Sequence, residues 1–230
     1  MKNRIIGTGR GQFPGGRPHI RYGRIRRMSH PDPGGPSDLT PIKVGEVWEN
    51  PVAGERLTIL ERPWDNPEGR LAFEMAARVG ARVVGEHHHP ALVEQFTVLE
   101  GELTVKRNGQ TSILPQGETA VAEAGVWHDW WNASPRDVRV RVEITPGLRF
   151  AQMIETFFGL ARLGHTDRKG MPSMLQLSLT ASEFSDVVVF RSPPPVVQRA
   201  VFGSLGPIAR MLGYRATYPQ LSRNVLAPRI

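Results

Sequence analysis

The feature that most constrains the fold is a series of short segments, between residues 56 and 144, in which apolar and polar residues alternate. Successive side chains of an extended strand point to opposite faces, so the alternation predicts strands with one buried face. Turn-forming residues separate the segments, and Asn108-Gly109 is a strong signal for a two-residue hairpin turn. Many short strands at this spacing predict a β-sandwich or a closed barrel. The alternating segments are 56–62, 70–76, 95–99, 102–106 and 137–144.

The pattern changes after residue 147, where apolar residues recur at the three- and four-residue spacing of an amphipathic helix. Residues 150–163 and 171–184 are predicted helices. A third helix is expected to begin at the prolines of 193–195, because proline suits the first turn of a helix, and Pro207 is expected to kink or split it. We expect these helices to cover one face of the barrel or a dimer partner; a lid over a substrate is the alternative.

The positive charge of the chain lies at one end. The net charge is +7, yet residues 1–27 hold eight basic residues and no acidic one, which leaves 21 basic against 22 acidic residues elsewhere. We therefore predict three regions: a basic, Gly/Pro-rich, disordered tail at 1–41, a strand-rich domain at 42–147 and a helical extension at 148–230. A basic tail can bind nucleic acid weakly through phosphate neutralisation, but no recognised nucleic-acid-binding module follows it, so nucleic acid is not an expected partner.

The absence of cysteine limits the chemistry. It excludes disulfides, thiolate ligands and a cysteine nucleophile, so any metal ion must be held by nitrogen and oxygen atoms. No segment approaches the roughly 20 apolar residues of a membrane span, and the N-terminal region lacks the apolar core of a secretory signal. We expect a cytoplasmic protein with no membrane contact.

Three consecutive histidines begin at His87 and supply the strongest chemical signal. In an extended strand His87 and His89 point to the same side and can converge on one interior point, while the histidine between them faces outward. Glu94 follows five residues later, past Pro90, which interrupts the strand and allows the chain to bend back. Two imidazoles and one carboxylate suit a divalent first-row metal ion and leave coordination positions open for chemistry.

Two segments resemble the paired sequence motifs of the cupin superfamily. Residues 80–101, GARVVGEHHHPALVEQFTVLEG, are similar to the first motif: Gly, six residues, His-x-His, four residues, Glu, six residues and Gly. Residues 117–132, GETAVAEAGVWHDWWN, are similar to the second. Glu123 stands where proline is usual, but this departure does not affect a ligand position. The positions of the second motif that match in register are Gly117, Gly125, His128 and Asn132.

The resemblance implies a mainly β fold, a double-stranded β-helix or jelly-roll barrel of the RmlC-like kind, here followed by a C-terminal helical extension. It also implies one divalent transition metal ion, whether Fe, Mn, Ni, Zn or Cu. In related dioxygenase cupins the carboxylate ligand is thought to act as a catalytic base too, a role that for Glu94 would require a pKa raised by burial. Small cupins commonly dimerise, so a homodimer is expected. The implied ligands are His87, His89, Glu94 and His128.

Strand parity also suggests the walls of a substrate pocket. Phe96 shares the side of Glu94, and Trp130 shares the side of His128, so both are predicted to line the pocket, as is Phe73. Arg141 would line it if the valines of its strand point outward under the helices, and could then recognise a carboxylate or phenolate. The more ordinary alternative places the valines in the core and the charges in solvent.

The predicted function is metal-dependent chemistry on a small organic molecule, with a non-haem dioxygenase type as the leading subtype. A redox-neutral isomerase or cyclase, in which the metal serves only as a Lewis acid, would suit the same ligands. A noncatalytic cupin that binds a small molecule is the alternative from a different class. A structural role like that of seed-storage cupins is disfavoured by the complete ligand set.

Overall fold

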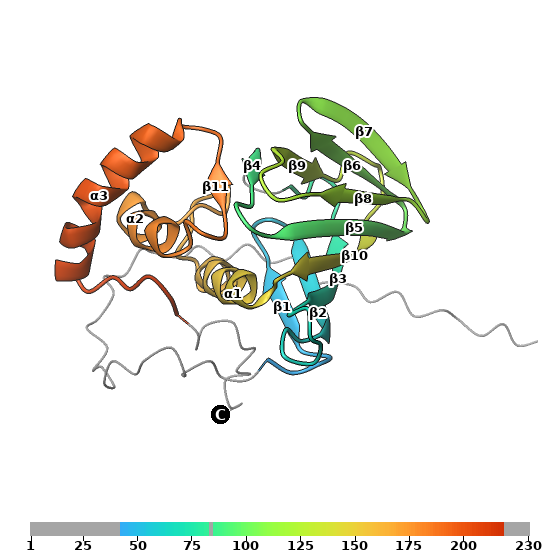
Figure 1. The fold of residues 1–230 in the computed structure, drawn as a ribbon, viewed down its shortest axis with the longest axis horizontal. Helices are drawn as coiled ribbons and strands as arrows, with labels where there is room; N and C mark the ends of the chain where they lie inside the picture. The colour runs from blue at the N-terminus through green and yellow to red at the C-terminus, as the bar shows by residue number, and fades with distance from the viewer. Residues whose placement is uncertain (1–41, 83–84, 219–230) are drawn as a thin grey trace, which may run out of the picture. The chain divides into compact units, whose positions relative to one another are not determined.

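Two antiparallel β-sheets form the framework of the described part of the chain, which comprises residues 42–82 and 85–218 of the computed structural model (Figure 1). These residues fall in one of the two units into which the chain divides, Gly34–Ile230. In spatial order, the six-stranded sheet contains β1 (Val47–Asn50), β2 (Glu55–Glu61), β3 (Leu71–Ala77), β10 (Val138–Thr145), β5 (Val93–Glu100) and β8 (Thr119–Ala122). The five-stranded sheet contains β11 (Val189–Phe190), β4 (His87–His88), β9 (His128–Trp131), β6 (Glu102–Arg107) and β7 (Gln110–Pro115).

The strand pairing is nested about the hairpin of β6 and β7. Moving outward from that hairpin, β5 pairs with β8, β4 with β9 and β3 with β10, and successive pairs alternate between the two sheets. A folded two-stranded ribbon wound in this way is a jelly roll. The hairpin turn is the predicted one: Asn108 and Gly109 have φ of 48° and 83°, and a type I′ turn requires positive φ at both positions.

The core lies between the sheets and is built from the alternation seen in the sequence. On β10 the four apolar residues 138, 140, 142 and 144 are each no more than 1% exposed. Val142 lies opposite Phe73 of β3 on one side and Phe96 of β5 on the other. These contacts place the apolar face of each strand inside, where burial supplies most of the favourable free energy of folding.

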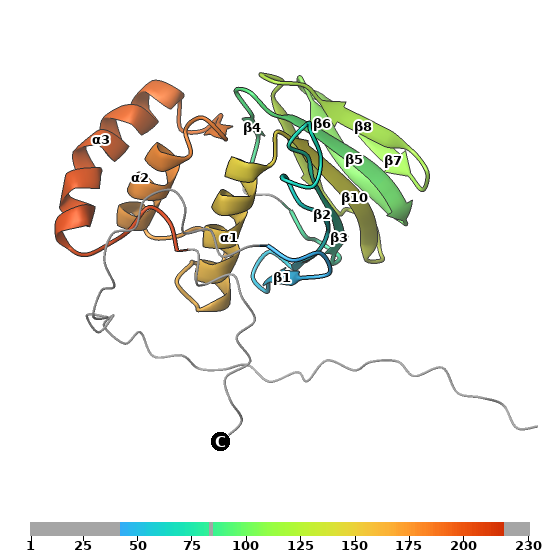
Figure 2. The ribbon, with the colours of Figure 1, turned by 60° about the horizontal axis from the view of Figure 1, so that its bottom comes forward.

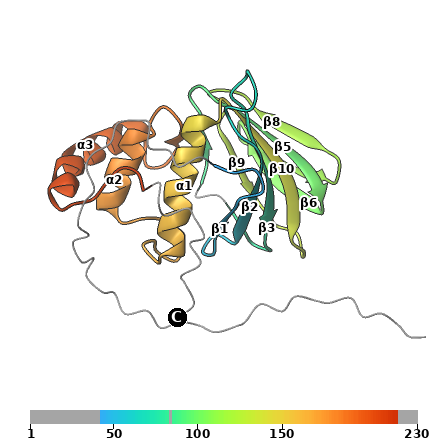
Figure 3. The ribbon, with the colours of Figure 1, turned by 90° about the horizontal axis from the view of Figure 1, so that it is seen from below.

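Three helices follow the strands: α1 (Leu148–Arg162), α2 (Met174–Glu183) and α3 (Pro195–Met211). Figures 2 and 3 show α1 between the strands and the other two helices. Phe150 of α1 stacks on Phe73 of β3, with 6.5 Å between the ring centroids. Gly147 is the N-cap residue that precedes α1, and a Cβ at this position would collide with Leu71. Only glycine therefore allows the helix to start so close to β3.

The predicted mainly β jelly roll with helices after it is confirmed. All three predicted helices form, and α3 is not split at Pro207, which lies inside it. The predicted disordered tail, residues 1–41, lies outside the described residues. Among the residues that the structure does describe, no helix combines the length and apolar character needed to cross a membrane.

Candidate metal centre

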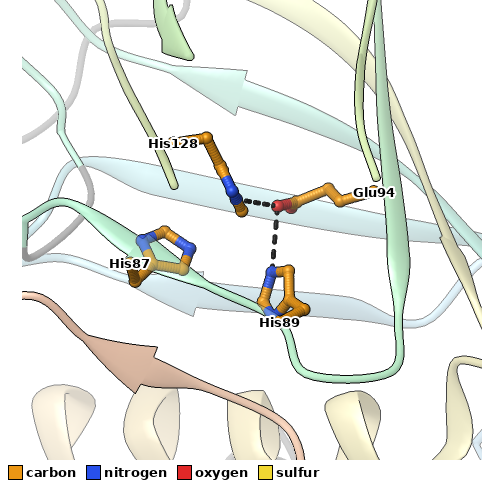
Figure 4. Close-up of side chains that lie close together, drawn as sticks. All are labelled: His87, His89, Glu94 and His128. Carbon is orange, nitrogen blue, oxygen red and sulfur yellow. Dashed lines mark hydrogen bonds and ion pairs between the residues drawn. The ribbon is translucent and has the colours of Figure 1, made fainter. Parts of the chain in front are cut away.

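Four buried side chains converge at one point inside the barrel (Figure 4). Their possible ligand atoms all lie within 4.8 Å of one another, and none of the four residues is more than 5% exposed. These are the four residues that the two sequence motifs indicated. They are His87, His89, Glu94 and His128.

The jelly-roll pairing explains this convergence. β4 and β9 run side by side in the five-stranded sheet, and their register places His87 directly opposite His128. After β4 the chain turns at Pro90 into β5 of the other sheet, which carries Glu94. The turn is held by a hydrogen bond of 2.8 Å from the backbone N–H of Gly125 to the carbonyl of His89. The two sheets thus contribute ligands from opposite sides of one interior point.

Each imidazole is fixed by a hydrogen bond on the side away from the centre. Nδ1 of His87 donates to the carbonyl of Gly85 at 2.9 Å, and Nδ1 of His128 donates to that of Val126 at 2.9 Å. Nδ1 of His89 donates to the carbonyl of Val187 at 2.6 Å. Because a carbonyl can only accept, all three Nδ1 atoms carry a proton and all three Nε2 atoms are available to the centre. Such outer hydrogen bonds are the usual way in which histidine ligands are oriented.

The carboxylate of Glu94 is the anion of the cluster. Its Oε2 lies 2.9 Å from Nε2 of His128 and 3.2 Å from Nε2 of His89. Burial alone would raise the pKa of Glu94, but the hydrogen bonds and charges of His128 and His89 outweigh it and hold the pKa below its usual value. Burial likewise lowers the pKa of His128, and its hydrogen bond to Glu94 more than reverses that effect. The raised pKa that a base role for Glu94 would require is therefore not found.

The donor set fits a divalent metal ion. Since Nδ1 of His89 and of His128 already donates, each Nε2 can face the carboxylate only if a proton or another cation lies between them. His87 is neutral, because burial lowers its pKa to about 3, and its Nε2 lone pair accepts no hydrogen bond from any of the described residues. One cation bound by three imidazole nitrogens and a carboxylate oxygen satisfies all four groups at once.

A cavity of about 120 Å³ adjoins the cluster. It has room for roughly eight to twelve water-sized groups, the size of a small organic molecule. Most of its wall is apolar and is supplied by the inner face of the six-stranded sheet and by α1. The cavity wall includes Phe73, Phe96 and Trp130, the three aromatic residues for which the sequence suggested this position.

The exception among the suggested pocket residues is Arg141, which does not line the cavity. Its neighbours Val140 and Val142 occupy the inner face of β10. The side chain of Arg141 points the other way, is 38% exposed and lies 3.1 Å from Glu143 Oε1. Burying the valines is favourable, whereas a guanidinium inside the barrel would need a buried partner. The structure therefore has the alternative arrangement, with the charged side chains of β10 outside.

The helical extension contributes parts of the site that the sequence did not indicate. β11 pairs with β4 so that Phe190 lies opposite His87, with 5.9 Å between the ring centroids. The carbonyl that orients His89 belongs to Val187, 98 residues away in the chain. Phe150 of α1 contacts His89 edge-on at 5.8 Å. The sequence signal for this segment, which ends with β11, is its short apolar run, residues 187–190.

Comparisons with known proteins identify a family and several similar structures. The family model for the cupin domain matches residues 73–145, which include all four clustered residues. Two similar solved structures are KdgF from Halomonas sp., with 21% identity, and a predicted oxalate decarboxylase from Thermotoga maritima, with 22% identity. The first alignment covers 43% of this chain and 84% of that one; the second covers 40% and 79%; both have a TM-score of 0.38.

A third similar structure is the cupin domain of an XRE family transcriptional regulator from Enterobacter cloacae. It is 23% identical, and the alignment covers 40% of this chain and 96% of that one with a TM-score of 0.35. No curated protein matches the chain. The match to the family model, the nested strand pairing and the buried cluster together lead to one conclusion. This chain contains a cupin domain, at residues 73–145.

Proposed function

We propose that the protein binds one divalent transition metal ion and acts on a small organic molecule held in the adjoining cavity. The observation that supports this most directly is the convergence of three imidazole Nε2 atoms on one buried carboxylate. Each imidazole is fixed by its own hydrogen bond to a backbone carbonyl, so the arrangement exists before any ligand arrives. The residues that would hold the ion are His87, His89, Glu94 and His128.

Such an ion supplies Lewis acidity and, if it is iron, manganese, nickel or copper, redox chemistry as well. The protein's own contribution is to orient the substrate and to enclose it. Phe73, Phe96 and Phe150 present apolar surface beside the cluster, which excludes water and strengthens electrostatic interactions with a bound substrate. Glu94 remains ionised and neutralises part of the charge of the ion.

Dioxygenase-type chemistry is our leading form of this proposal, because an apolar cavity next to the centre suits both an organic substrate and dioxygen. A redox-neutral isomerase or cyclase needs only the Lewis acid, and a noncatalytic binding protein needs only the cavity. Oxygen consumption separates the first from the second, and turnover separates both from the third.

The test begins with the metal content of the purified protein. We expect about one transition metal ion per chain in the wild type and in His165→Ala, whose side chain is exposed, and a large loss in His128→Ala. Oxygen uptake is then followed with a panel of enols and phenols. A wild-type protein without stoichiometric metal, or His128→Ala with a full complement, would contradict the proposal. Turnover without oxygen uptake would favour the redox-neutral form, and tight binding without turnover the noncatalytic one.

A further inference from the structure

Two polar residues of the cavity wall do not belong to the metal cluster and face each other on neighbouring strands. Asn50 is the last residue of β1 and Glu55 the first of β2, and the two are paired in the register of these strands. Both line the same cavity as His87, His89 and Glu94. A single ligand in that cavity can therefore meet both sets of polar groups.

The register of the sheet places this pair at the far end of the cavity from the cluster. Glu94 and Ile144 lie opposite each other in one row of inward-facing side chains across the sheet. The neighbouring inward-facing row contains Phe73 and Ile59. On β2, Glu55 lies four residues from Ile59 on the side away from Glu94, about 13 Å along the strand. The inner row between them contains Leu57, which is apolar and lines the cavity. The cavity thus has a polar end at each extreme and an apolar middle.

The polar groups of this pair are available to a ligand. Asn50 Oδ1 accepts hydrogen bonds from the N–H groups of Val52 and Ala53, at 3.2 and 3.0 Å, which fixes the amide. Its Nδ2 has no hydrogen-bond acceptor among the described residues, and the Glu55 carboxyl has neither a hydrogen bond nor an ion pair there. Glu55 is only partly buried, and neither polar group is among the buried atoms that lack a partner, so a ligand in the cavity can reach both.

The charge state of the pair restricts what that ligand is. Burial raises the pKa of Glu55 to about 8, so at neutral pH this carboxyl is mostly protonated and can both donate and accept. Arg82, the other charged wall residue outside the cluster, is exposed and forms no ion pair with Glu55. An uncharged hydroxyl can accept from Asn50 Nδ2 and exchange hydrogen bonds with Glu55, and neither partner requires an ionised ligand.

We propose that Asn50 and Glu55 form a second polar subsite, and that the substrate is a small, mostly apolar molecule with an uncharged hydroxyl at the end remote from the metal centre. This proposal rests on the proposed function, since the other end of the same molecule would be held at the centre. The hydroxyl accepts a hydrogen bond from the Asn50 amide and donates to the Glu55 carboxyl.

Matched pairs of phenols test the subsite. Each pair consists of a 4-alkylphenol and the 4-(ω-hydroxyalkyl)phenol of equal chain length, with one to four carbons, titrated calorimetrically into zinc-loaded protein because zinc does not oxidise phenols. At one chain length we expect the hydroxylated member to bind the wild type about three- to tenfold more tightly, the worth of one or two hydrogen bonds. Glu55→Gln should keep this preference, and Glu55→Leu should abolish or reverse it.

The control is Glu102→Leu, which makes the same change at an exposed strand position outside the cavity and should keep the preference of the wild type. Equal binding of both members of every pair by the wild type, or an undiminished preference in Glu55→Leu, would overturn the subsite. Tighter binding of phenols that end in a carboxylate or an ammonium group would overturn it as well. Zinc content separates these results from a failure of the metal site, because Glu55→Leu should retain one zinc ion per chain.

Discussion

Replacing His87 with alanine should remove a metal ligand while it disturbs the rest of the site little. His87 is 5% exposed, and its one hydrogen bond runs from Nδ1 to the carbonyl of Gly85. Its Nε2 takes no part in the hydrogen bonds of Glu94, which involve His89 and His128. Without metal, the variant loses one hydrogen bond and the packing of one ring, about 1–3 kcal/mol of unfolding free energy. We therefore expect it to fold.

The effect on metal binding should be larger and can be expressed as a change in melting temperature. A ligand present at one hundred times its Kd stabilises the folded state by about 2.7 kcal/mol. For a chain of this size that corresponds to roughly 5–11 °C. If loss of His87 raises the Kd for metal about a hundredfold, the same metal concentration contributes only about 0.4 kcal/mol, or roughly 1–2 °C.

The assay is thermal unfolding of metal-free protein, followed with and without zinc at a concentration one hundred times the wild-type Kd. His88→Ala is the matched control. This neighbouring histidine packs its ring against Trp127, 4.5 Å away, and is not part of the cluster. It should keep the full shift with zinc. Equal shifts in His87→Ala and the wild type would refute the assignment of His87 as a ligand, whatever the melting temperatures without metal.

Three further changes test other parts of the structure. Phe190→Ala, which removes the ring beside His87, should weaken metal binding about tenfold in the same titration, the scale of an outer-shell change; an unchanged Kd would contradict the role of β11. Gly147→Ala should lower the unfolding free energy by about 1–3 kcal/mol in urea, because its Cβ meets Leu71, whereas Gly203→Ala, in a helix with open space, should raise it by about 0.5–1 kcal/mol. A folded-state pKa of Glu55 near 8, above the unfolded 4.5, means that stability is lost as pH rises between these values, so Glu55→Gln should gain melting temperature over the wild type from pH 5 to pH 8 and then level off. A constant difference over that range would show that Glu55 is not desolvated.

Much of the site follows from strand parity alone. The two-residue spacing of His87 and His89 places both in the barrel, and the same rule places Phe96 beside Glu94. Parity also carried a signal for Glu55, which shares the inward side with Leu57. From sequence alone, a charged residue at the start of a strand is normally interpreted as lying in solvent at the strand end, even when its parity is inward. Only the structure shows that the strand end borders the cavity.

Other features could not follow from local pattern. The carbonyl of Val187 orients His89 through a backbone atom, and any residue at that position would offer the same atom. The sequence also left undecided which face of β10 is buried. Alternation places Val142 and Arg141 on opposite faces but does not say which face is the core. Packing decides it, because Val142 meets Phe73 and Phe96 across the sheet, while Arg141 finds its partner, Glu143, on the outer surface.

The two halves of the site therefore have different origins in the chain. The four clustered residues all lie within the cupin domain, residues 73–145. Much of the cavity wall comes from outside it: Asn50 and Glu55 precede the domain, and Phe150 and Phe190 follow it. The residues that would hold a metal ion thus belong to the domain, whereas much of the wall that would meet a ligand belongs to the flanking segments. Changes at Glu55 should alter which molecule binds and leave metal affinity unchanged, whereas changes at His87 should lower metal affinity.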